Sequence, residues 1–396
     1  MNTLLEKSEQ LIKREQSSFA RYLNKQINWS NRLIGIKGSR GTGKTTLMLQ
    51  KLKSLKKQSN EAAYFSLDDL YFTTNSLVET AETFHKKGGQ YLFLDEVHKY
   101  PGWAKHIKNL YDFNPDLTIV FTGSSIIDIA KEEADLSRRA RMYELQGLSF
   151  REYLAYIEVL DLNPFDLDEI LSEKSNWKET FPGNFKPMKY FETYLARGYY
   201  PFFKEDETGY HDRLSQLTRL IVEYDMAELK DFDIRNAKKM LQLLYILSAN
   251  VPFKPNLSTL ANKSNIHRNS VSNYLYYLEE ARLIKLLYHS GISVAILQKP
   301  EKIYLDNTNL SFAISPGMPE KGNLRETFFL NQLSNSHSVR YPSHGDFVVN
   351  EKWTFEVGGK DKQDTQIRTI KNSFVVRDDV PFPATGLPLW LFGFLY

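Results

Sequence analysis

Two patterns of apolar and polar residues alternate along the first 150 residues. Short apolar runs bounded by polar residues or glycine predict β-strands; these runs are RLIGIKG (32–38), AAYFSLDD (62–69), QYLFLDEV (90–97), LTIVFTGSS (117–125) and RMYELQGL (141–148). Helical spacing of apolar residues marks the segments between them, namely KTTLMLQKLKSL, SLVETAETFHKKG, WAKHIKNLYDF and IIDIAKEEADLS. Strands that alternate with helices of this length predict βαβ units, and therefore an α/β domain with a mainly parallel sheet over residues 1–150.

The pattern changes after residue 150, which predicts further domains. The chain first becomes helical and rich in aromatic residues, and ANVPFKPN (249–256), with two prolines, reads as a linker. Residues 257–287 then show two helical stretches across a short turn, the helix-turn-helix pattern, with a strand pair expected to follow as a wing. We therefore expect a helical lid over 151–248, a winged helix-turn-helix over 249–300 and a small α+β domain over 301–396.

Composition narrows the class of protein. The 396 residues, 42% hydrophobic and 13% aromatic, suffice for two or three packed domains. The net charge of +3 permits a nucleic-acid partner without requiring one. The absence of cysteine excludes disulfides, thiol catalysis and cysteine-bound zinc. The charged N-terminal segment and the lack of a long apolar run predict neither a signal peptide nor a membrane span, so we expect a cytoplasmic protein.

A glycine-rich loop follows the first predicted strand and has the pattern G-x-x-x-x-G-K-T. Its glycines let the backbone approach a phosphate closely, and the next helix offers its positive N-terminal end. Lys44 is expected to reach the β- and γ-phosphates, and Thr45 to ligate Mg²⁺. The sequence therefore predicts a site for ATP and Mg²⁺ made of Gly38, Ser39, Arg40, Gly41, Thr42, Gly43, Lys44, Thr45 and Thr46.

Two acidic residues end the third predicted strand, in the run QYLFLDEV. An aspartate at the tip of a buried strand beside such a loop can hold Mg²⁺ through water, and the adjacent glutamate can polarise the attacking water. We therefore expect Asp95 to be a metal residue and Glu96 to be the catalytic base.

A cluster of hydroxyl residues ends the fourth predicted strand, in IVFTGSS. A polar residue at this point can sense the γ-phosphate and orient the water. Ser124 is the first choice, with Thr122 and Ser125 as alternatives. Each of these hydroxyls can equally be a plain N-cap of the following helix.

Three arginines precede the last predicted strand, in LSRRARMYEL: Arg138, Arg139 and Arg141. One of them can act as an arginine finger, either within the chain or on a neighbouring subunit. The alternative is a solvated basic run.

Residues 18–155 resemble the prokaryotic ATPases of the AAA superfamily that carry a C-terminal domain of unknown function. The resemblance rests on GSRGTGKTT, LFLDEVHKYPGWAKHIKNLYD, FTGSS and YELQGLSFREYL. It implies the AAA type of P-loop fold and ATP hydrolysis, and it selects Arg139 as the catalytic arginine, although Arg138 stands where the family has glycine. Further on, YLARGYYPFF resembles the family's Gly-x-Pro element, with one extra residue between Gly198 and Pro201.

The C-terminal region has a second set of acidic residues. A helical stretch with Glu326, then Asp346 and Glu356 on two predicted strands, resembles in its order the PD-(D/E)xK nuclease core. In that core the carboxylates hold Mg²⁺, which activates water, and a lysine stabilises the developing charge. Here Gly358 takes the place of that lysine and Lys360 follows two residues later. Because of this departure, a degenerate binding or structural module is preferred over an active nuclease.

The second helix of the helix-turn-helix pattern carries polar residues near its start. These could contact the phosphates and bases of DNA. Acidic residues follow in YLEE, and basic residues are sparse, so a purely structural packing role is the alternative. The candidate DNA contacts are Arg268, Asn269, Ser272 and Asn273.

Three functions are compatible with these features. The preferred one is an ATP-hydrolysing protein that couples nucleotide state to its winged-helix and C-terminal domains. The others are a nucleotide-gated switch that binds DNA or protein and hydrolyses slowly, and an ATP-controlled nuclease. The partner can be DNA, another protein or further copies of the chain, and no membrane partner is expected. His98 and His106 lack the spacing of a metal site such as H-E-x-x-H.

Overall fold

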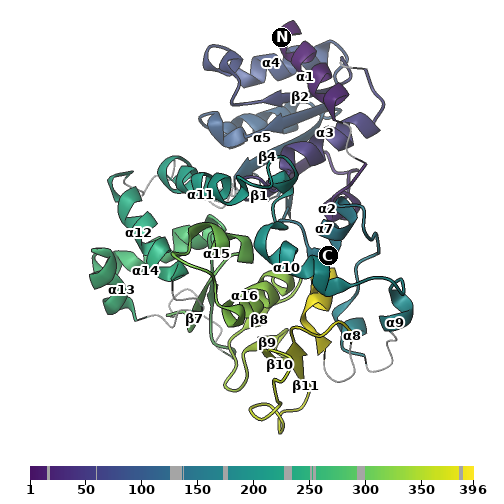
Figure 1. The fold of residues 1–396 in the computed structure, drawn as a ribbon. Helices are drawn as coiled ribbons and strands as arrows, with labels where there is room; N and C mark the ends of the chain where they lie inside the picture. Colours follow the sequence, from purple (N-terminus) through teal and green to yellow (C-terminus); the bar gives the residue numbers. More distant parts are fainter. Residues whose placement is uncertain are drawn as a thin grey trace. The chain divides into compact units, whose positions relative to one another are not determined.

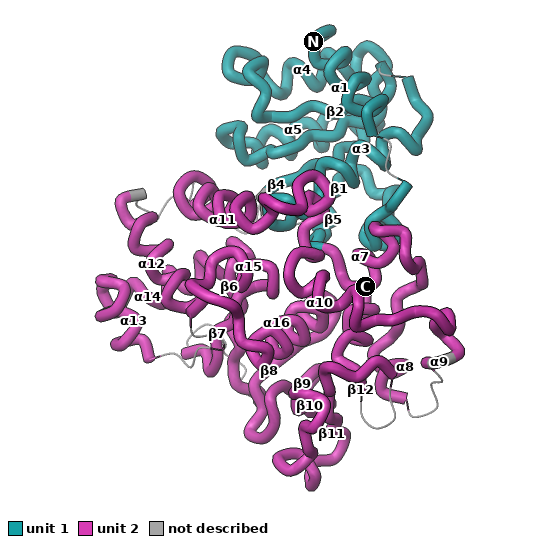
Figure 2. The backbone as a smooth tube through the Cα atoms, in the orientation of Figure 1, with its two compact units in different colours: residues 1–147, 228–231 teal, residues 148–227, 232–396 magenta. Residues whose placement is uncertain are grey.

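The computed structural model describes residues 1–396 except 16–17, 59, 125–135, 137, 173–176, 227–233, 250–251, 253–255, 292–298 and 383–386, and it leaves out the side chains of Ser124, Lys178 and Asn269. The chain divides into two compact units (Figure 2). Unit 1 is residues 1–147 and 228–231, and unit 2 is residues 148–227 and 232–396. Within the described ranges, none of the helices combines the length and the apolar character needed to span a bilayer.

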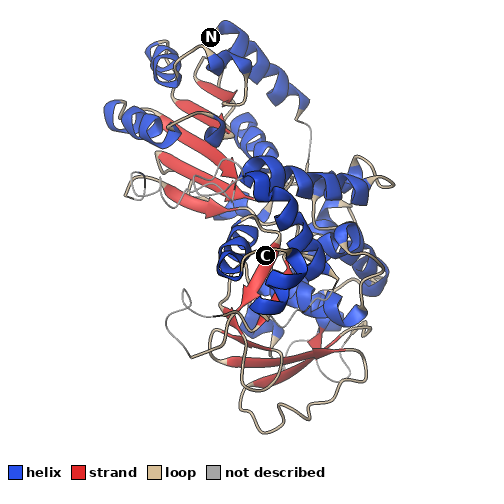
Figure 3. Cartoon of the chain, turned by 90° about the vertical axis from the view of Figure 1, so that its left-hand side faces the viewer, coloured by secondary structure: helices blue, strands red, loops and turns tan. Residues whose placement is uncertain are grey.

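Unit 1 is built on a parallel five-stranded sheet in the order β2-β3-β4-β1-β5. Its helices lie on both faces of the sheet (Figures 1 and 3), which explains why the central strands are buried along nearly their whole length. The elements are α1 (Asn2–Arg14), α2 (Tyr22–Gln26), β1 (Leu33–Gly38), α3 (Lys44–Ser54), β2 (Ala62–Ser66), α4 (Leu77–Lys86), β3 (Tyr91–Asp95), α5 (Trp103–Phe113), β4 (Thr118–Ser124) and β5 (Arg141–Glu144).

This unit has the α/β architecture with a parallel sheet that the sequence predicts. The strands are shorter than the apolar runs, because β2 ends at Ser66, β3 at Asp95 and β5 at Glu144. The helix expected over residues 126–137 falls almost entirely outside the described residues. Strand β4 lies between β1 and β3, so the carboxyl ends of these three strands meet at one edge of the sheet, where open α/β sheets place their sites.

Unit 2 combines helices with a second, mixed sheet. Its elements are α7 (Phe150–Tyr156), α8 (Leu167–Ile170), α9 (Trp177–Thr180), α10 (Pro187–Arg197), α11 (Tyr210–Leu220), α12 (Ala237–Ser248), α13 (Leu257–Ser264), α14 (Arg268–Glu280), β6 (Ile284–Leu287), β7 (Lys302–Leu305), α15 (Thr308–Ile314), α16 (Lys321–Leu333), β8 (Val339–Arg340), β9 (Phe347–Val349), β10 (Trp353–Gly358), β11 (Ser373–Arg377), β12 (Leu387–Pro388) and the 3₁₀ helix η8 (Leu389–Phe394). The sheet order is β12-β11-β10-β9-β8, with β10 parallel to β11 and antiparallel to β9.

The apolar C-terminal tail lies inside the aromatic core of unit 2. Helix η8 is buried along its length, and Phe394 packs against Phe150 of α7 with ring centroids 5.9 Å apart. Phe150 also contacts Phe191 of α10, which in turn meets Phe328 of α16 edge to face. The region expected as a lid and the region expected as a C-terminal domain therefore share one core.

Helices α13 and α14 follow one another across residues 265–267, and strand β6 then pairs antiparallel with β7. Near the start of α14, Arg268, Ser272 and Asn273 are exposed to solvent, whereas the side chain of Asn269 lies outside the described residues. The exposed polar residues leave this end of α14 accessible to a partner.

Candidate active site

The loop between β1 and α3 surrounds the ammonium group of Lys44. Gly41 and Gly43 adopt φ angles of 84° and 92°, in the left-handed region that favours glycine, so the chain can turn sharply just before the helix. Lys44 is buried, and its Nζ donates hydrogen bonds to the carbonyls of Gly38 (2.9 Å) and Ser39 (3.1 Å). The loop thus holds a positive charge at the N-terminal end of α3, where an anion is favoured.

A buried arginine outside the predicted site supports this loop. Arg21, which precedes α2 and is only 4% exposed, donates to the carbonyl of Thr42 in the loop. Its guanidinium also donates to the carbonyls of Gln146 (2.6 Å) and Gly147 (3.0 Å), after the edge strand β5. Sequence reasoning did not find Arg21, because nothing in the local pattern indicates that it is buried.

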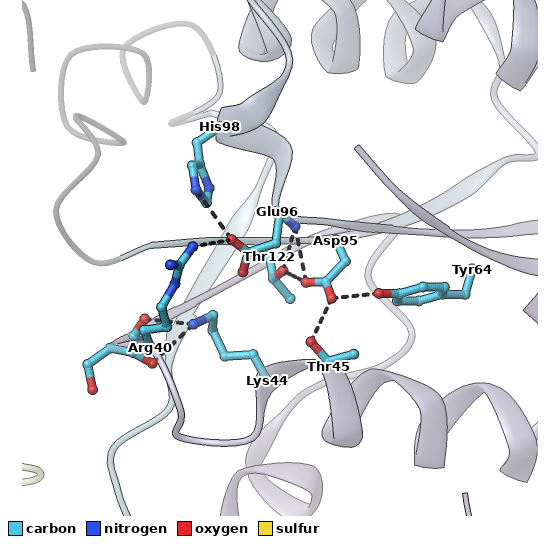
Figure 4. Close-up of polar contacts among 10 residues, drawn as sticks. Arg40, Lys44, Thr45, Tyr64, Asp95, Glu96, His98 and Thr122 are labelled. Atoms are coloured by element: carbon cyan, nitrogen blue, oxygen red, sulfur yellow. Dashed lines mark hydrogen bonds and ion pairs between the residues drawn. The ribbon is translucent and has the colours of Figure 1, made fainter. Parts of the chain in front are cut away.

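Asp95, at the end of β3, is the centre of a hydrogen-bond network (Figure 4). Its Oδ2 accepts from the hydroxyls of Thr45 (2.6 Å) and Tyr64 (2.7 Å). Its Oδ1 accepts from the hydroxyl of Thr122 and from the backbone N–H of Glu96 (3.1 Å). A buried carboxylate bonded to the hydroxyl at the start of α3 is an oxygen donor pair that suits Mg²⁺, so the residues present fit this ion.

Tyr64 and Thr122 reach Asp95 from the strands on either side of it. Tyr64 lies on β2, and burial, followed by the nearby charge of Asp95, raises the pKa of its hydroxyl, which therefore stays protonated and donates. Thr122 lies on β4 and is fully buried. Of the three hydroxyl residues considered at this strand, Thr122 is the one whose side chain is described, and it contacts Asp95. The side chain of Ser124 and all of Ser125 lie outside the described residues, so the role of Ser124 stays a prediction.

Glu96 begins the turn after β3 in an unusual backbone conformation. Its φ and ψ of 52° and 44° lie in the left-handed region, which is uncommon for a residue with a side chain and often marks a functional position. One carboxylate oxygen lies 3.8 Å from Nη2 of Arg40 and 3.3 Å from Nε2 of His98 (Figure 4). Burial, followed by the positive charges of Lys99, Lys44 and Arg40, lowers the pKa of His98 to about 3, so its imidazole is neutral.

Arg139 lies against α5. Its Nε and Nη2 donate to the two carboxylate oxygens of Asp112, at 2.8 and 3.0 Å, and these bonds lower the pKa of Asp112. Arg138 and Arg141 are exposed. The catalytic role expected for Arg139 requires the guanidinium to leave Asp112, and it stays a prediction.

The three C-terminal carboxylates come together in unit 2, around two lysines. Nζ of Lys302, on β7, lies 2.9 Å from Oε2 of Glu326 and 3.7 Å from Oδ1 of Asp346. Nζ of Lys362 lies 2.6 Å from Oε1 of Glu356. Sequence reasoning found the carboxylates but neither lysine, because Lys302 is distant from them in sequence and Lys362 lies outside the strand pattern, in the loop after β10.

Lys362, and not Lys360, contacts Glu356. Lys360 is exposed, whereas the side chain of Lys362 crosses Gly358 so closely that a Cβ there would lie 2.5 Å from Lys362 Cδ. The glycine at the motif position therefore makes room for a lysine that arrives from the following loop.

Two further groups of the protein donate to the cluster, whereas Oε2 of Glu356 is buried and has no hydrogen-bond partner among the described residues. Tyr304 donates to Oε2 of Glu326 (2.7 Å), and the N–H of Val357 donates to Oδ2 of Asp346 (2.9 Å). Burial raises the pKa of Glu356, although its bond to Lys362 opposes this shift. Among the described residues, no three acidic or histidine side chains are arranged to hold a metal ion.

Family comparisons agree with the architecture of unit 1. Residues 30–154 match the family model of the AAA domain, and this range contains the loop, Asp95, Glu96 and β5. Unit 1 has the fold of an AAA-type P-loop ATPase. The matched range also contains Tyr64 and Thr122, whose hydroxyls donate to Asp95 from the two neighbouring strands. A second family model, a domain of unknown function (DUF8612), matches residues 188–317 of unit 2.

The similarity to other proteins covers more of the chain than the residues that match the AAA domain model. The uncharacterized protein MJ1637 of Methanocaldococcus jannaschii is 29% identical over 289 residues, which are 70% of this chain and 61% of that protein. MJ1544 of the same organism is 25% identical over 316 residues, 75% of this chain and 67% of that protein. Among solved structures, the Walker-type ATPase PABY2304 of Pyrococcus abyssi has a TM-score of 0.42 and 14% identity, over 76% of this chain and 97% of that one. AMPPCP-bound DnaA from Aquifex aeolicus has a TM-score of 0.28 and 16% identity, over 68% and 86%. Because these TM-scores are low, the assignment rests on the family model and the strand order.

Proposed function

We propose that this protein binds ATP with Mg²⁺ and hydrolyses it, and that it passes the nucleotide state to the winged-helix region and the C-terminal region. The observation that carries the proposal is the bond between Thr45 and Asp95 beside the buried ammonium of Lys44. A cation and an oxygen donor pair at one edge of the sheet suit a triphosphate and its metal together.

Each side chain has a defined task in this proposal. Lys44 binds the phosphates, and Thr45 and Asp95 hold the Mg²⁺, which when bound neutralises charge on the phosphate oxygens. Glu96 accepts a proton from the attacking water. The water oxygen forms a bond to the γ-phosphorus, the bond from that phosphorus to the β–γ bridging oxygen breaks, and ADP and phosphate result. Tyr64 and Thr122 keep Asp95 in place through the bonds they donate.

In this proposal, the nucleotide state acts on a partner that binds to unit 2. The exposed polar side chains at the start of α14, Arg268, Ser272 and Asn273, favour a surface that contacts DNA, as in helix-turn-helix proteins. A protein partner or a second copy of the chain at the same place is the alternative. A nucleotide-gated switch with slow hydrolysis uses the same residues and differs only in turnover rate.

Hydrolysis of Mg-ATP is the first test, with Lys44→Ala as the blank. We expect turnover that requires Mg²⁺ and is lost in the variant, since alanine removes the buried ammonium that the loop carbonyls hold in place. Adding double-stranded DNA separates the outputs: stimulation supports DNA contact by α14, and indifference points to a protein partner. Equal turnover by Lys44→Ala and the unaltered protein would contradict the proposal.

We propose further that the C-terminal carboxylate cluster is a degenerate nuclease-like module with a structural role. What supports this is the position of Lys302, whose ammonium lies against Glu326 and Asp346, where a nuclease of this type holds its metal. An internal cation removes the need for a bound one. A site occupied in this way lacks the metal that would activate water.

Nuclease assays test this second proposal directly. We expect no Mg²⁺- or Mn²⁺-dependent cleavage of DNA by the full chain, and no difference between the unaltered protein and Asp346→Ala. A metal-dependent cutting activity that disappears in Asp346→Ala would show that the cluster is catalytic. Contaminating nucleases are recognised because they persist in that variant.

A further inference from the structure

Arg40 has a position that its place in the phosphate loop does not explain. It lies between two loop glycines, and its guanidinium approaches the carboxylate of Glu96 rather than the centre of the loop (Figure 4). The side chains of Arg40 and Glu96 are 31% and 25% exposed, so both are partly shielded from water without being fixed in the core. A pair of this kind is weak and can exchange partners.

A buried histidine also lies beside the Glu96 carboxylate. The side chain of His98 is 1% exposed, and its Nε2 lies 3.3 Å from the same oxygen that faces Arg40. Neither ring nitrogen has a hydrogen bond of good geometry to a described residue, although both are buried. The left-handed backbone at Glu96 constrains its side chain, because it sets the direction in which the side chain leaves the turn.

We infer that Arg40 is a positioning residue. Its guanidinium holds Glu96 while the loop contains no nucleotide, and it leaves Glu96 for the γ-phosphate when ATP binds. This inference rests on the proposed ATP hydrolysis at the same site. The physical reason is competition, since a guanidinium prefers the several charged oxygens of a phosphate, which it can bind in a bidentate way, to a single carboxylate oxygen at 3.8 Å. Release of Glu96 then coincides with arrival of the phosphate that its water attacks.

The pair has a measurable consequence for affinity. ATP binding must break the contact between Arg40 and Glu96, so Glu96→Gln should tighten the binding of a non-hydrolysable ATP analogue by about threefold to fivefold. The gain should vanish in the Arg40→Ala background, where there is no contact to break. ADP lacks the γ-phosphate, so Glu96→Gln should leave the affinity for ADP unchanged in both backgrounds.

Isothermal titration of four proteins with the analogue and with ADP tests the inference: the unaltered chain, Glu96→Gln, Arg40→Ala and the double variant. Arg40→Lys is the conservative variant, and it should retain part of the coupling because it keeps the charge but loses the planar fork. An equal effect of Glu96→Gln with and without Arg40, or the same effect on ADP, overturns the inference. Failure of the proposed function is distinguishable, because then no variant binds either nucleotide or Lys44→Ala binds as well as the unaltered protein.

Discussion

Glu96→Gln is expected to lower the rate of ATP hydrolysis by about 10²- to 10⁴-fold while ATP still binds. Glutamine has nearly the shape of glutamate, but its neutral amide cannot accept a proton from water. The phosphate-binding groups are unchanged, since Lys44 is bonded to loop carbonyls and Thr45 to Asp95. The measurement is the maximal rate at saturating Mg-ATP together with the dissociation constant of ATP.

The matched control is Glu6→Gln, which removes an exposed glutamate of α1 in the same unit and should leave the rate unchanged. Hydrolysis by Glu96→Gln at the rate of the unaltered protein would show that another group accepts the proton. Loss of ATP binding in the same variant would mean that Glu96 supports the loop, and its catalytic role would have to be tested separately.

Lys302→Met is expected to destabilise unit 2 by about 3 kcal/mol, because it leaves two carboxylates without their cation. Methionine fills much of the space of the lysine stem, so the loss is mainly electrostatic. Nζ of Lys302 contacts Glu326 and Asp346, and the lysine side chain is only 9% exposed. Amide hydrogen exchange in β10 measures the effect locally, as a lower free energy of opening, without requiring the two units to unfold together.

Lys360→Met is the control for this substitution, because Lys360 is exposed and should change the opening free energy by no more than about 0.5 kcal/mol. Combining Lys302→Met with Glu326→Gln should restore part of the loss, since one uncompensated charge is then removed. Equal protection of β10 in Lys302→Met and in the unaltered protein would show that Lys302 does not neutralise the cluster. Tighter binding of Mn²⁺ to Lys302→Met than to the unaltered protein would support the view that the lysine takes the place of a metal.

Features encoded in short stretches of chain could be predicted from the sequence. The phosphate loop depends on glycines at fixed spacing and on the strand and helix beside it, and all of these lie within residues 32–55. Asp95 and Glu96 were recognised because an apolar run ends in them. The parallel α/β architecture followed in the same way, since the alternation of strand and helix patterns is itself local.

Features that depend on which strands are neighbours could not be predicted in this way. Tyr64 and Thr122 reach Asp95 because β2 and β4 flank β3, and sheet order is decided by long-range packing. Thr122 and Ser124 are two residues apart, so the period of two in a strand gives the sequence no way to choose between them. The contact between Thr122 and Asp95 depends on β4 lying beside β3 in the sheet.

The sequence by itself determined the chemistry of the loop and the identity of the acidic residues, because both are set by residue type and short spacing. Only the tertiary structure decided that Arg21 supports the loop, that Lys362 crosses Gly358, and that the apolar tail completes the core of unit 2. The physical reason is that the burial and the charge partners of a side chain depend on residues from distant parts of the sequence. Local pattern shows what a side chain can do, and packing determines which partner it meets.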